Sequence, residues 1–454
     1  MIKLKRISAP KPQKISPFSL PKIEELQITN INKIIYVQKK NLPIVRFSYV
    51  LELGSRFDPA DKKGLANLFG MVLDEGAGRL NALELKEKFQ MLGTNFSINT
   101  SKDSVSFSFL SLKENFSKSL YLINLILTKP NFSEKDFERE KSKILTSHQQ
   151  IQDSADYIAD ISFDSLIFEN NSYAFPTIGI KDHLTKLSLQ DIKVYYKNIF
   201  KKAIPYLIIV GDLEKKNLAR AVQTKFGPIR QYNSIKKMDK ISGQKKTQIY
   251  FVNKKGSVQS GIRIGHINNK RNEKDFYSKT LLNTIFGGQF SSRLNLNLRE
   301  KKGYTYGIHS SFDNYKDASV FNISTSVSSE NTANAIGEII GEMEKIRKGV
   351  TKEELSFAKS SISKRFPSNF ETYGQIASNI SSIIKHNLPN NYFNDYLKKI
   401  NKVTLNEVKN TAVKNIHPKK SIILVVGDKE KILTQLEKLK LGKITEVGIF
   451  GDKL

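Results

Sequence analysis

The sequence contains no cysteine, and this absence excludes a disulfide framework and any metal site built from thiolates. No stretch approaches the roughly 18 apolar residues of a membrane-spanning helix, so we expect no membrane span. The basic, proline-rich start lacks the apolar core of a secretory signal. We expect a cytoplasmic protein, or a periplasmic one if a signal peptide preceded the recorded sequence. Histidine is scarce, and no two of the six residues fall within one helical turn: His148, His183, His266, His309, His386 and His417.

Acidic residues are in deficit, because 44 of them stand against 73 basic residues, a net charge of +29. Nucleic-acid binding and a solvated, lysine-rich surface are the two interpretations to weigh. The lysines are spread along the chain, and the basic segment 235–246 has no interleaved aromatic residues on which bases would stack. We therefore predict no nucleic-acid partner. The positive charge is available to attract an acidic partner or substrate.

What the sequence does contain is a duplication. Residues 189–215 and 405–431 align without a gap at an offset of 216, and both have the pattern of a helix, a turn, an apolar strand and Gly-Asp. Residues 132–144 match 350–362 at an offset of 218, and in each copy a Ser or Thr precedes an acidic first turn, as a helix N-cap does. A shorter third pair has an offset of 214: Arg79-Leu80-Asn81 and Arg293-Leu294-Asn295.

The 454 residues are long enough for two or more domains. We predict an N-terminal extension (1–19), a first α+β repeat (20–228), a basic linker (229–246) and a second α+β repeat (247–454). Segments with a period of two residues alternate with segments of helical periodicity in both repeats. The expected fold class is α+β, with two homologous halves arranged as a clamshell and, in each half, helices packed on one face of a mixed β-sheet.

One short helix has an apolar face and an unexplained polar face. Within "GLANLFGMVLDEGAG" (64–78), the residues Leu65, Leu68, Phe69 and Val72 form one helical face. On the other side, Asn67, Gly70 and Met71 have the i, i+3, i+4 spacing with which a helical metalloprotease holds zinc and a catalytic base. None of these side chains suits the role, because glycine has no base and Asn and Met are poor zinc ligands beside imidazole and carboxylate.

At these residues the chain resembles the pitrilysin and mitochondrial-processing-peptidase family of zinc metallopeptidases. The resemblance covers nearly the whole chain. It places the first His, the Glu and the second His of the family's H-x-x-E-H motif at Asn67, Gly70 and Met71. The last zinc ligand, a Glu seven residues after a second Glu at the position of Glu140, falls on Ser147. The resemblance therefore implies a degenerate zinc motif and no metal in this chain. We interpret His148, the neighbour of Ser147, as a packing or surface residue.

The first half lacks the family's zinc-binding residues, whereas the second half resembles the family in another segment of the active site. The stretch "FGGQFSSRLNLNLREKKGYTYG" (286–307) is similar to the family's glycine-rich segment with its following Arg and Tyr, here Arg299 and Tyr306. The resemblance implies that these two reach a zinc site as catalytic residues. A phenol O–H stabilises the oxyanion of peptide cleavage, and a guanidinium holds a carbonyl or positions the tyrosine. It also implies a substrate-binding loop, Gly287, Gly288, Gln289 and Phe290. The two glycines are equally consistent with a cap on the preceding helix.

These residues favour one function and leave others open. Some family enzymes consist of two different chains, one with the zinc motif and one with the Arg-Tyr pair. We interpret this chain as the zinc-free subunit of such a heterodimer, inactive alone, whose homologous H-x-x-E-H partner holds the zinc and cleaves a peptide or unfolded protein. The alternative is a proteolytically inactive structural or peptide-binding protein on the same fold. An enzyme with a relocated metal site needs a His, Asp and Glu cluster that the sequence does not show. Other ordinary roles for Arg299 and Tyr306 are a helix-end salt bridge and a half-buried strand residue.

Overall fold

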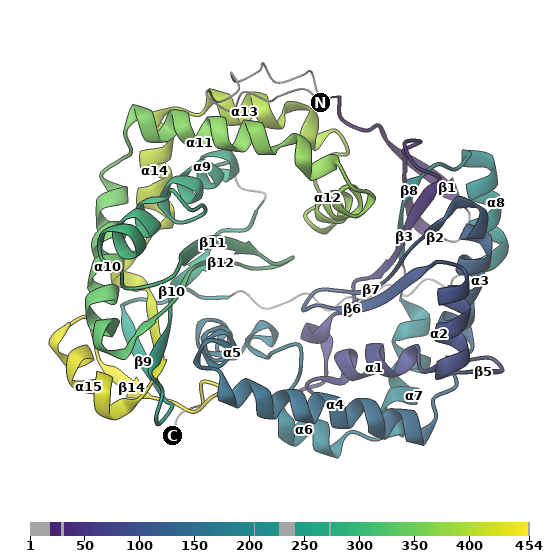
Figure 1. Cartoon of the computed structure of the whole chain (residues 1–454), viewed down its shortest axis with the longest axis horizontal. Coiled ribbons are helices and arrows are strands. Elements are labelled where there is room, and N and C mark those ends of the chain that lie inside the picture. Colours follow the sequence, from purple (N-terminus) through teal and green to yellow (C-terminus); the bar gives the residue numbers. More distant parts are fainter. Residues whose placement is uncertain (1–18, 29–30, 204, 227–240, 272–273, 453–454) are drawn as a thin grey trace, which may run out of the picture.

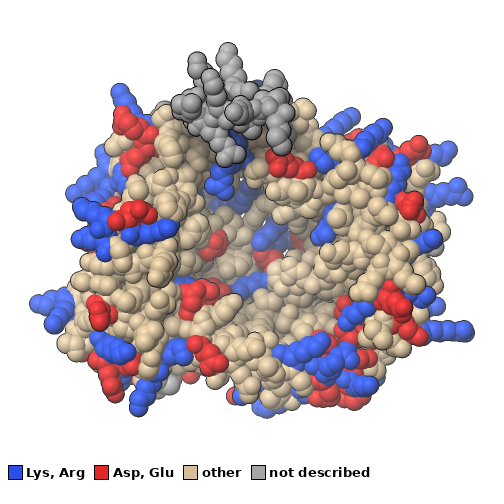
Figure 2. All heavy atoms as spheres, viewed as in Figure 1, with Lys and Arg blue, Asp and Glu red and all other residues tan. Residues whose placement is uncertain are grey.

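The computed structural model describes residues 19–28, 31–203, 205–226, 241–271 and 274–452. Within them the chain forms two six-stranded mixed sheets, one in each half, and the halves curve around a central space (Figure 1). A space-filling view shows this space as a hollow at the centre of the visible face (Figure 2). Most of the predicted extension (1–18) and of the predicted linker (229–240) lies outside the described residues, so those boundaries stay predictions.

The first sheet has the strand order β1-β2-β8-β3-β7-β6, and only β2 and β8 pair in parallel. Alternating apolar residues direct one face of β3 and β7 into the core, where Phe47 stacks on Phe109. The central strand β8 is buried on every residue, as its unbroken apolar sequence predicts for a strand covered on both faces. The strands are β1 (Ile23–Ile28), β2 (Ile31–Gln38), β3 (Ile44–Leu51), β6 (Asn95–Thr100), β7 (Val105–Leu112) and β8 (Tyr206–Gly211).

The second sheet repeats this order as β14-β9-β13-β10-β12-β11. The strand β13 takes the place of β8 and pairs in parallel with β9, as β8 does with β2. One edge differs, because β14 runs parallel to β9 whereas β1 runs antiparallel to β2. The strands are β9 (Gln248–Asn253), β10 (Gln259–Asn268), β11 (Ile308–Asn314), β12 (Ser319–Ser328), β13 (Ile422–Gly427) and β14 (Ile444–Glu446). A separate two-stranded ribbon joins β4 (Gly76–Ala77) to β5 (Leu80–Asn81).

The helices confirm the duplication. The predicted repeats 189–215 and 405–431 form the equivalent pairs α7–β8 and α14–β13, and Ser133 and Thr351 cap α4 and α11 as expected. The first half contains α1 (Leu65–Leu73), α2 (Ala82–Met91), α3 (Phe116–Thr128), α4 (Glu134–Asp153), α5 (Ala155–Phe168), α6 (Lys181–Lys186), α7 (Leu189–Asn198) and α8 (Lys215–Phe226). The second contains α9 (Phe276–Phe286), α10 (Thr332–Arg347), α11 (Lys352–Arg365), α12 (Tyr373–Lys385), α13 (Tyr396–Lys402), α14 (Leu405–Asn415) and α15 (Lys429–Lys438).

One helix of each half packs against the sheet of the other half, a feature that the sequence did not predict. The helices of each half cover one face of their own sheet, as expected, but the opposite face is met by a helix from the other half. Phe163 and Ile167 of α5 pack with β10 and β13, and Ile376 and Ile380 of α12 pack against β2 and β8. These two apolar clusters hold the halves together.

The face of β10 that receives α5 has two glycines around one arginine. A Cβ added at Gly261 would lie 2.8 Å from the carbonyl oxygen of Ala155, and one at Gly265 would lie 2.9 Å from Cζ of Phe163, which belongs to α5 as well. Between the glycines, the buried Arg263 donates from Nε to Asp160 at 2.7 Å and from an Nη to Asp156 at 2.9 Å. The bare glycine positions therefore allow the helix to come close enough for both ion pairs.

A buried carboxylate, Asp103 of the first half, also contacts residues of both halves. Asp103 accepts the hydroxyl of Tyr173 at 2.6 Å, the Nζ of Lys385 at 2.9 Å and the backbone N–H of Lys316 at 2.9 Å. The last two partners belong to the second half, on α12 and on the β11–β12 turn. Arg56 extends the network, because it lies 3.4 Å from Asp103 and 2.5 Å from Asp317. The two halves are thus joined by charge as well as by apolar packing.

Candidate functional site

The three positions that the sequence aligned with a zinc motif lie together. Asn67, Gly70 and Met71 on α1 line one cavity of about 300 Å³, and Glu140 of α4 lines it with them. The helix is held in place by the opposite face, where Leu65, Leu68, Phe69 and Val72 are buried in the core of the first half. Three of the four aligned positions therefore share one cavity, and none of the three has the side chain of a good zinc ligand or a catalytic base.

Ion pairs occupy the surroundings of this cavity. Glu140 and Glu75 are both buried, and Arg139 bridges them, with 3.1 Å between its Nε and Glu140. Lys86 lies 2.6 Å from Glu75, and Lys143 lies 2.6 Å from Glu140. Two of the three carboxylates that line the cavity, Glu75 and Glu140, therefore face ammonium and guanidinium groups, which supply the positive charge that a metal would otherwise bring.

At Gly70, the position aligned with the catalytic base, a neighbouring side chain fills the space. A Cβ at Gly70 would lie 2.9 Å from Oγ1 of Thr100 and 3.5 Å from Cγ2 of Ile98, both on the edge strand β6. The side chain of Thr100 thus stands where a longer residue at 70 would begin. A general base cannot act here, because Gly70 has no side chain and its space is taken.

The remaining metal positions agree with this. Ser147 is half-buried on α4, is not among the lining residues of this cavity, and donates its hydroxyl to the carbonyl of Lys143 at 3.0 Å. His148 is buried, as the packing interpretation expected, and burial lowers the pKa of its imidazole. Among the described residues no three His, Cys, Asp or Glu side chains are placed to hold a metal ion. The cavity does not fit zinc, and no catalytic step is assigned to it.

A second cavity brings together the residues predicted in the other half. Arg299, Tyr306, Gly287, Gln289 and Phe290 line one space of about 540 Å³. The fourth predicted loop residue, Gly288, is not among its lining residues. Its neighbour Gly287 is the C-cap of α9, and the backbone N–H groups of Gly287 and Gly288 both donate to the carbonyl of Asn283, at 3.0 and 2.7 Å. The glycines therefore cap the helix, and Gly287 also forms part of the cavity wall.

Arg299 lies on a π-helical segment, Asn295–Lys301. Such segments are rare and often occur at functional sites, because the wider turn redirects side chains. The Arg299 guanidinium lies 4.1 Å from the centre of the Phe290 ring, and its Nε is 3.6 Å from the carboxylate of Glu300. The Glu300 contact is the kind of helix-end salt bridge that the sequence left open, but the stacking on Phe290 turns the guanidinium into the cavity wall.

Tyr306 stands out from the loop before β11. Its side chain is 93% exposed, so the alternative of a half-buried strand residue is wrong. Its neighbours are fixed: Thr305 donates from Oγ1 to the carbonyl of Ser326 at 2.8 Å, and the N–H of Gly307 donates to Thr305 at 3.1 Å. A hydrogen-bonded loop therefore presents a phenol that is almost fully surrounded by solvent.

Two further charged residues belong to this cavity and were missed by the sequence analysis. Arg263 lines it from the floor, and Asp156, which belongs to α5 of the first half, lines it beside Arg263. Burial opposes ionisation of Asp156, but the Arg263 guanidinium holds the pKa of that carboxyl below its ordinary value. Arg263 could have been found from the sequence, because an arginine interrupts the apolar pattern of β10. No sequence pattern pointed to Asp156, because its position in this cavity depends on the packing of α5 against the second half.

The positively charged side chains of the described residues are spread over the visible surface and form no single patch there. On the face shown in Figure 2, Lys and Arg side chains surround the rim and alternate with acidic groups. No helix among the described residues has the length and apolar character needed to cross a membrane.

Comparison with known proteins agrees with this geometry. Residues 33–179 match the family described as insulinase (peptidase family M16), and residues 186–362 match the peptidase M16 inactive domain. The chain is 23% identical over 402 residues to the non-peptidase homolog YmxG of Helicobacter pylori, covering 88% of this chain and 92% of the relative. It is 22% identical over 371 residues to the zinc protease PqqE of the same species, covering 79% and 82%.

Solved structures show the same fold. A peptidase M16 inactive domain from Pseudomonas fluorescens superposes with a TM-score of 0.83 at 21% identity, over 90% of this chain and 98% of that one. A protease from Helicobacter pylori superposes with a TM-score of 0.81 at 20% identity, over 90% and 100%.

Proposed function

The chain belongs to peptidase family M16, and we propose that it is the zinc-free subunit of a heterodimeric metallopeptidase. A homologous subunit with an intact H-x-x-E-H motif would hold the zinc, and this chain would complete the site with Arg299 and Tyr306. The substrate class is a peptide or an unfolded protein segment. The expected compartment remains the cytoplasm, or the periplasm if the chain is exported with its partner.

The exposure of Tyr306 carries this proposal. A tyrosine that is 93% exposed on a hydrogen-bonded loop makes little contribution to its own fold. A hydroxyl in that position gains a role when another chain brings a reacting carbonyl to it, because a donor aimed at the oxyanion stabilises the transition state. The chain's own cavity at Asn67, Gly70 and Met71 offers no such reaction, so the zinc must come from elsewhere.

The other residues of the Tyr306 cavity fit a supporting role. Arg299 can donate two parallel hydrogen bonds to a substrate carbonyl or carboxylate. Phe290 is 62% exposed and forms an apolar wall beside it. Gly287 would let a peptide backbone approach the cavity wall, because it has no side chain, and Gly288 follows it as the helix cap outside the lining. Gln289 is anchored, since Ser361 donates to its Oε1 at 2.9 Å.

The relatives support a pair of chains. One species, Helicobacter pylori, has both a relative named as a non-peptidase homolog and a relative named as a zinc protease. Both resemble this chain along most of their length. A zinc protease and a non-peptidase homolog in one species match the two kinds of chain that the proposed heterodimer requires.

The direct test is to co-express the chain with its H-x-x-E-H homologue and to measure cleavage of a fluorogenic peptide. Tyr306→Phe removes one hydroxyl and keeps the ring. We expect kcat to fall about 10²–10³-fold, by analogy with the loss of other single oxyanion donors, while the partner keeps its zinc. The matched control is Tyr304→Phe in the same loop, which lies outside the Tyr306 cavity and should cleave at the parental rate.

Arg299→Ala should act mainly on KM, because a guanidinium that holds a ground-state carbonyl contributes to substrate and transition state alike. Both variants must still pair with the partner and keep their thermal unfolding midpoint. If Tyr306→Phe pairs normally and cleaves like the parent, Tyr306 has no catalytic role and the heterodimer proposal loses its main support.

A proteolytically inactive peptide-binding or structural protein is the second candidate. The name of the Helicobacter relative, a non-peptidase homolog, favours it. It predicts that the isolated chain binds an unstructured peptide in fluorescence anisotropy and that addition of the zinc-bearing homologue produces no cleavage dependent on this chain. A partner that is fully active alone would decide for this candidate.

A further inference from the structure

An apolar groove lies on the outer surface of the first half, between α2 and α3. Figure 1 shows these helices at the periphery, on the side of the first sheet away from the second half. The groove has a volume of about 580 Å³ and is lined mainly by Met91, Leu92, Tyr121 and Leu122, with Lys88 and Lys118. It is separate from both cavities described above, so it does not depend on the proposed function.

Part of the apolar lining of this groove is exposed, whereas Leu122 is buried at its base. The side chain of Met91 is 79% exposed and that of Tyr121 is 49% exposed, and Leu83, about two turns before Met91 on α2 and outside the lining, is 76% exposed. Scattered exposed apolar residues are ordinary, but two large ones that line the same concave surface, here Met91 and Tyr121, indicate an interaction site. Methionine suits such a surface, because its flexible, polarisable side chain adapts to different partners.

The charge of the groove has one sign. Lys88 and Lys118 lie on its two helices, and no carboxylate lines it. Within the described part of the chain neither lysine has an ion-pair partner, whereas Lys86, also on α2, pairs with Glu75 at 2.6 Å. Two free ammonium groups beside an apolar floor are complementary to carboxylates beside an apolar ridge.

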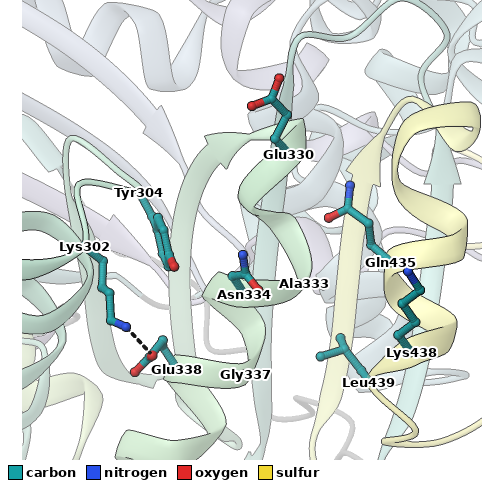
Figure 3. A pocket seen from close by; sticks show the side chains of 10 residues that line it. All are labelled: Lys302, Tyr304, Glu330, Ala333, Asn334, Gly337, Glu338, Gln435, Lys438 and Leu439. Atoms are coloured by element: carbon teal, nitrogen blue, oxygen red, sulfur yellow. Dashed lines mark ion pairs between the residues drawn. The ribbon is translucent and has the colours of Figure 1, made fainter.

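The duplication supplies an internal comparison, because the second half has a groove at the equivalent place (Figure 3). The offset of 214 relates Lys88 to Lys302, and the offset of 216 relates Tyr121 to Gly337 and Leu122 to Glu338. In that groove Lys302 points toward Glu338 and pairs with it at 3.1 Å (Figure 3).

The tyrosine of the first groove is a glycine in the second, and α15 adds two polar side chains, Gln435 and Lys438. The fold therefore does not require an apolar lining or free lysines at this place. Only the groove of the first half combines them.

We propose that the α2–α3 groove docks an acidic amphipathic segment of another protein, with apolar residues on the floor and carboxylates at Lys88 and Lys118. An amphipathic helix laid into a hydrophobic groove is a common mode of recognition. Other occupants fit less well. The segments of this chain outside the described residues, 1–18 and 227–240, are rich in lysine and arginine, and a second copy carries the same +29 charge. A lipid surface is flat, whereas this site is concave.

The experiment uses the full chain and two synthetic fluorescent peptides of about five helical turns. Both place Leu and Phe at i, i+3, i+4 and i+7, and one carries Glu and the other Lys on the flanking positions. We expect the Glu peptide to bind at least about tenfold more tightly in fluorescence anisotropy. Its affinity should fall as salt rises from 0.1 to 1 M, because the Debye length shrinks from roughly 10 to roughly 3 Å.

Surface variants then locate the site. Lys88→Glu combined with Lys118→Glu should reverse the preference between the peptides, and Met91→Glu should weaken binding of the Glu peptide at least about tenfold. The matched control is Asn334→Glu, at the position equivalent to Lys118, which should leave binding unchanged. Thermal midpoints check that every variant folds.

Three results would overturn the proposal. The first is no binding of the Glu peptide. The second is equal binding of both peptides, or an equal effect of Asn334→Glu. The third is binding of vesicles of phosphatidylglycerol and phosphatidylcholine that depends on Lys88 and Lys118 while neither peptide binds, which would identify a lipid surface instead.

Discussion

Replacing Asp103 by asparagine tests how the two halves are joined. The carboxylate is buried and has donors on both oxygens: Tyr173 and Arg56 at Oδ1, and Lys385 and the N–H of Lys316 at Oδ2. An amide keeps one acceptor oxygen, so an N–H₂ group must face donors on one side or the other. The change removes the charge and creates a donor–donor contact without changing the volume.

The magnitude follows from these contacts. Breaking a buried ion pair by removing one partner costs about 3–5 kcal/mol. Here the cost is smaller, because the Lys385 side chain is 32% exposed and the amide still accepts one set of donors. A buried donor left unsatisfied costs about 1–3 kcal/mol. We therefore expect Asp103→Asn to lower the free energy of unfolding by about 2–3 kcal/mol.

Urea unfolding followed by circular dichroism measures the effect. The matched control is Asp395→Asn, which removes an exposed carboxylate 3.6 Å from Lys398 and should change stability by no more than about 0.5 kcal/mol. Burial alone would raise the pKa of Asp103, but Lys385, Tyr173 and Arg56 together hold it below its ordinary value. Its contribution is therefore present above pH 4 and lost as the pH falls through the folded-state pKa, so Asp103→Asn should lose less stability on acidification than the parent. A cost equal to that of the control would refute the role of this carboxylate.

Three other outcomes follow from the same structure. Gly265→Ala should destabilise the chain by about 1–3 kcal/mol or more in the same urea assay, because the added Cβ meets the carbonyl of Phe321 at 2.1 Å; a neutral change would contradict the close approach of the strands there. Burial raises the pKa of Asp74 to about 6, so the folded state holds a proton that the unfolded state releases. Stability should therefore decline as the pH rises from about 4 to about 6, and Asp74→Asn should flatten that slope; an unchanged slope would assign the decline to another group. Elemental analysis of the purified chain should find no stoichiometric zinc, and a chelator should leave its melting point unchanged; one zinc retained per chain would show that the ion pairs around Glu140 do not exclude the metal.

Much of the fold was predictable because the duplication doubled every signal. The helix caps at Ser133 and Thr351, the apolar strands β8 and β13 and the helix at 65–73 all follow local rules of periodicity and capping. The exchange of α5 and α12 was not predictable. Each helix is amphipathic whichever sheet it meets, so the sequence pattern carries no information about which half receives it.

The sequence likewise predicted some residues of the candidate site and missed others. The alignment of motifs brought Arg299 and Tyr306 to one cavity, and the structure places them there. It did not predict Arg263 and Asp156, because their contact joins residues from different halves. Nor did it predict that Thr100 closes the space at Gly70, since that contact depends on how the edge strand β6 lies against α1.

The helix α1 shows why a chain can keep the frame of a zinc site without its chemistry. Its apolar face contributes four side chains to the core of the first half, so the helix is required for folding whatever its polar face does. The other face lines a cavity, where Met71 packs partly against the core and Gly70 leaves room for Thr100, so Asn67, Gly70 and Met71 are compatible with the fold. Lys86, Arg139 and Lys143 balance the carboxylates that remain, which removes the electrostatic need for a cation. In the second half the residues that we propose to react project from the core: Tyr306 is exposed on a loop, and Arg299 is half-buried on a π-helical segment whose Leu298 packs in the core. A fold of this kind separates what must be buried from what reacts, and a heterodimer can then divide the reacting groups between two chains without altering the core of either.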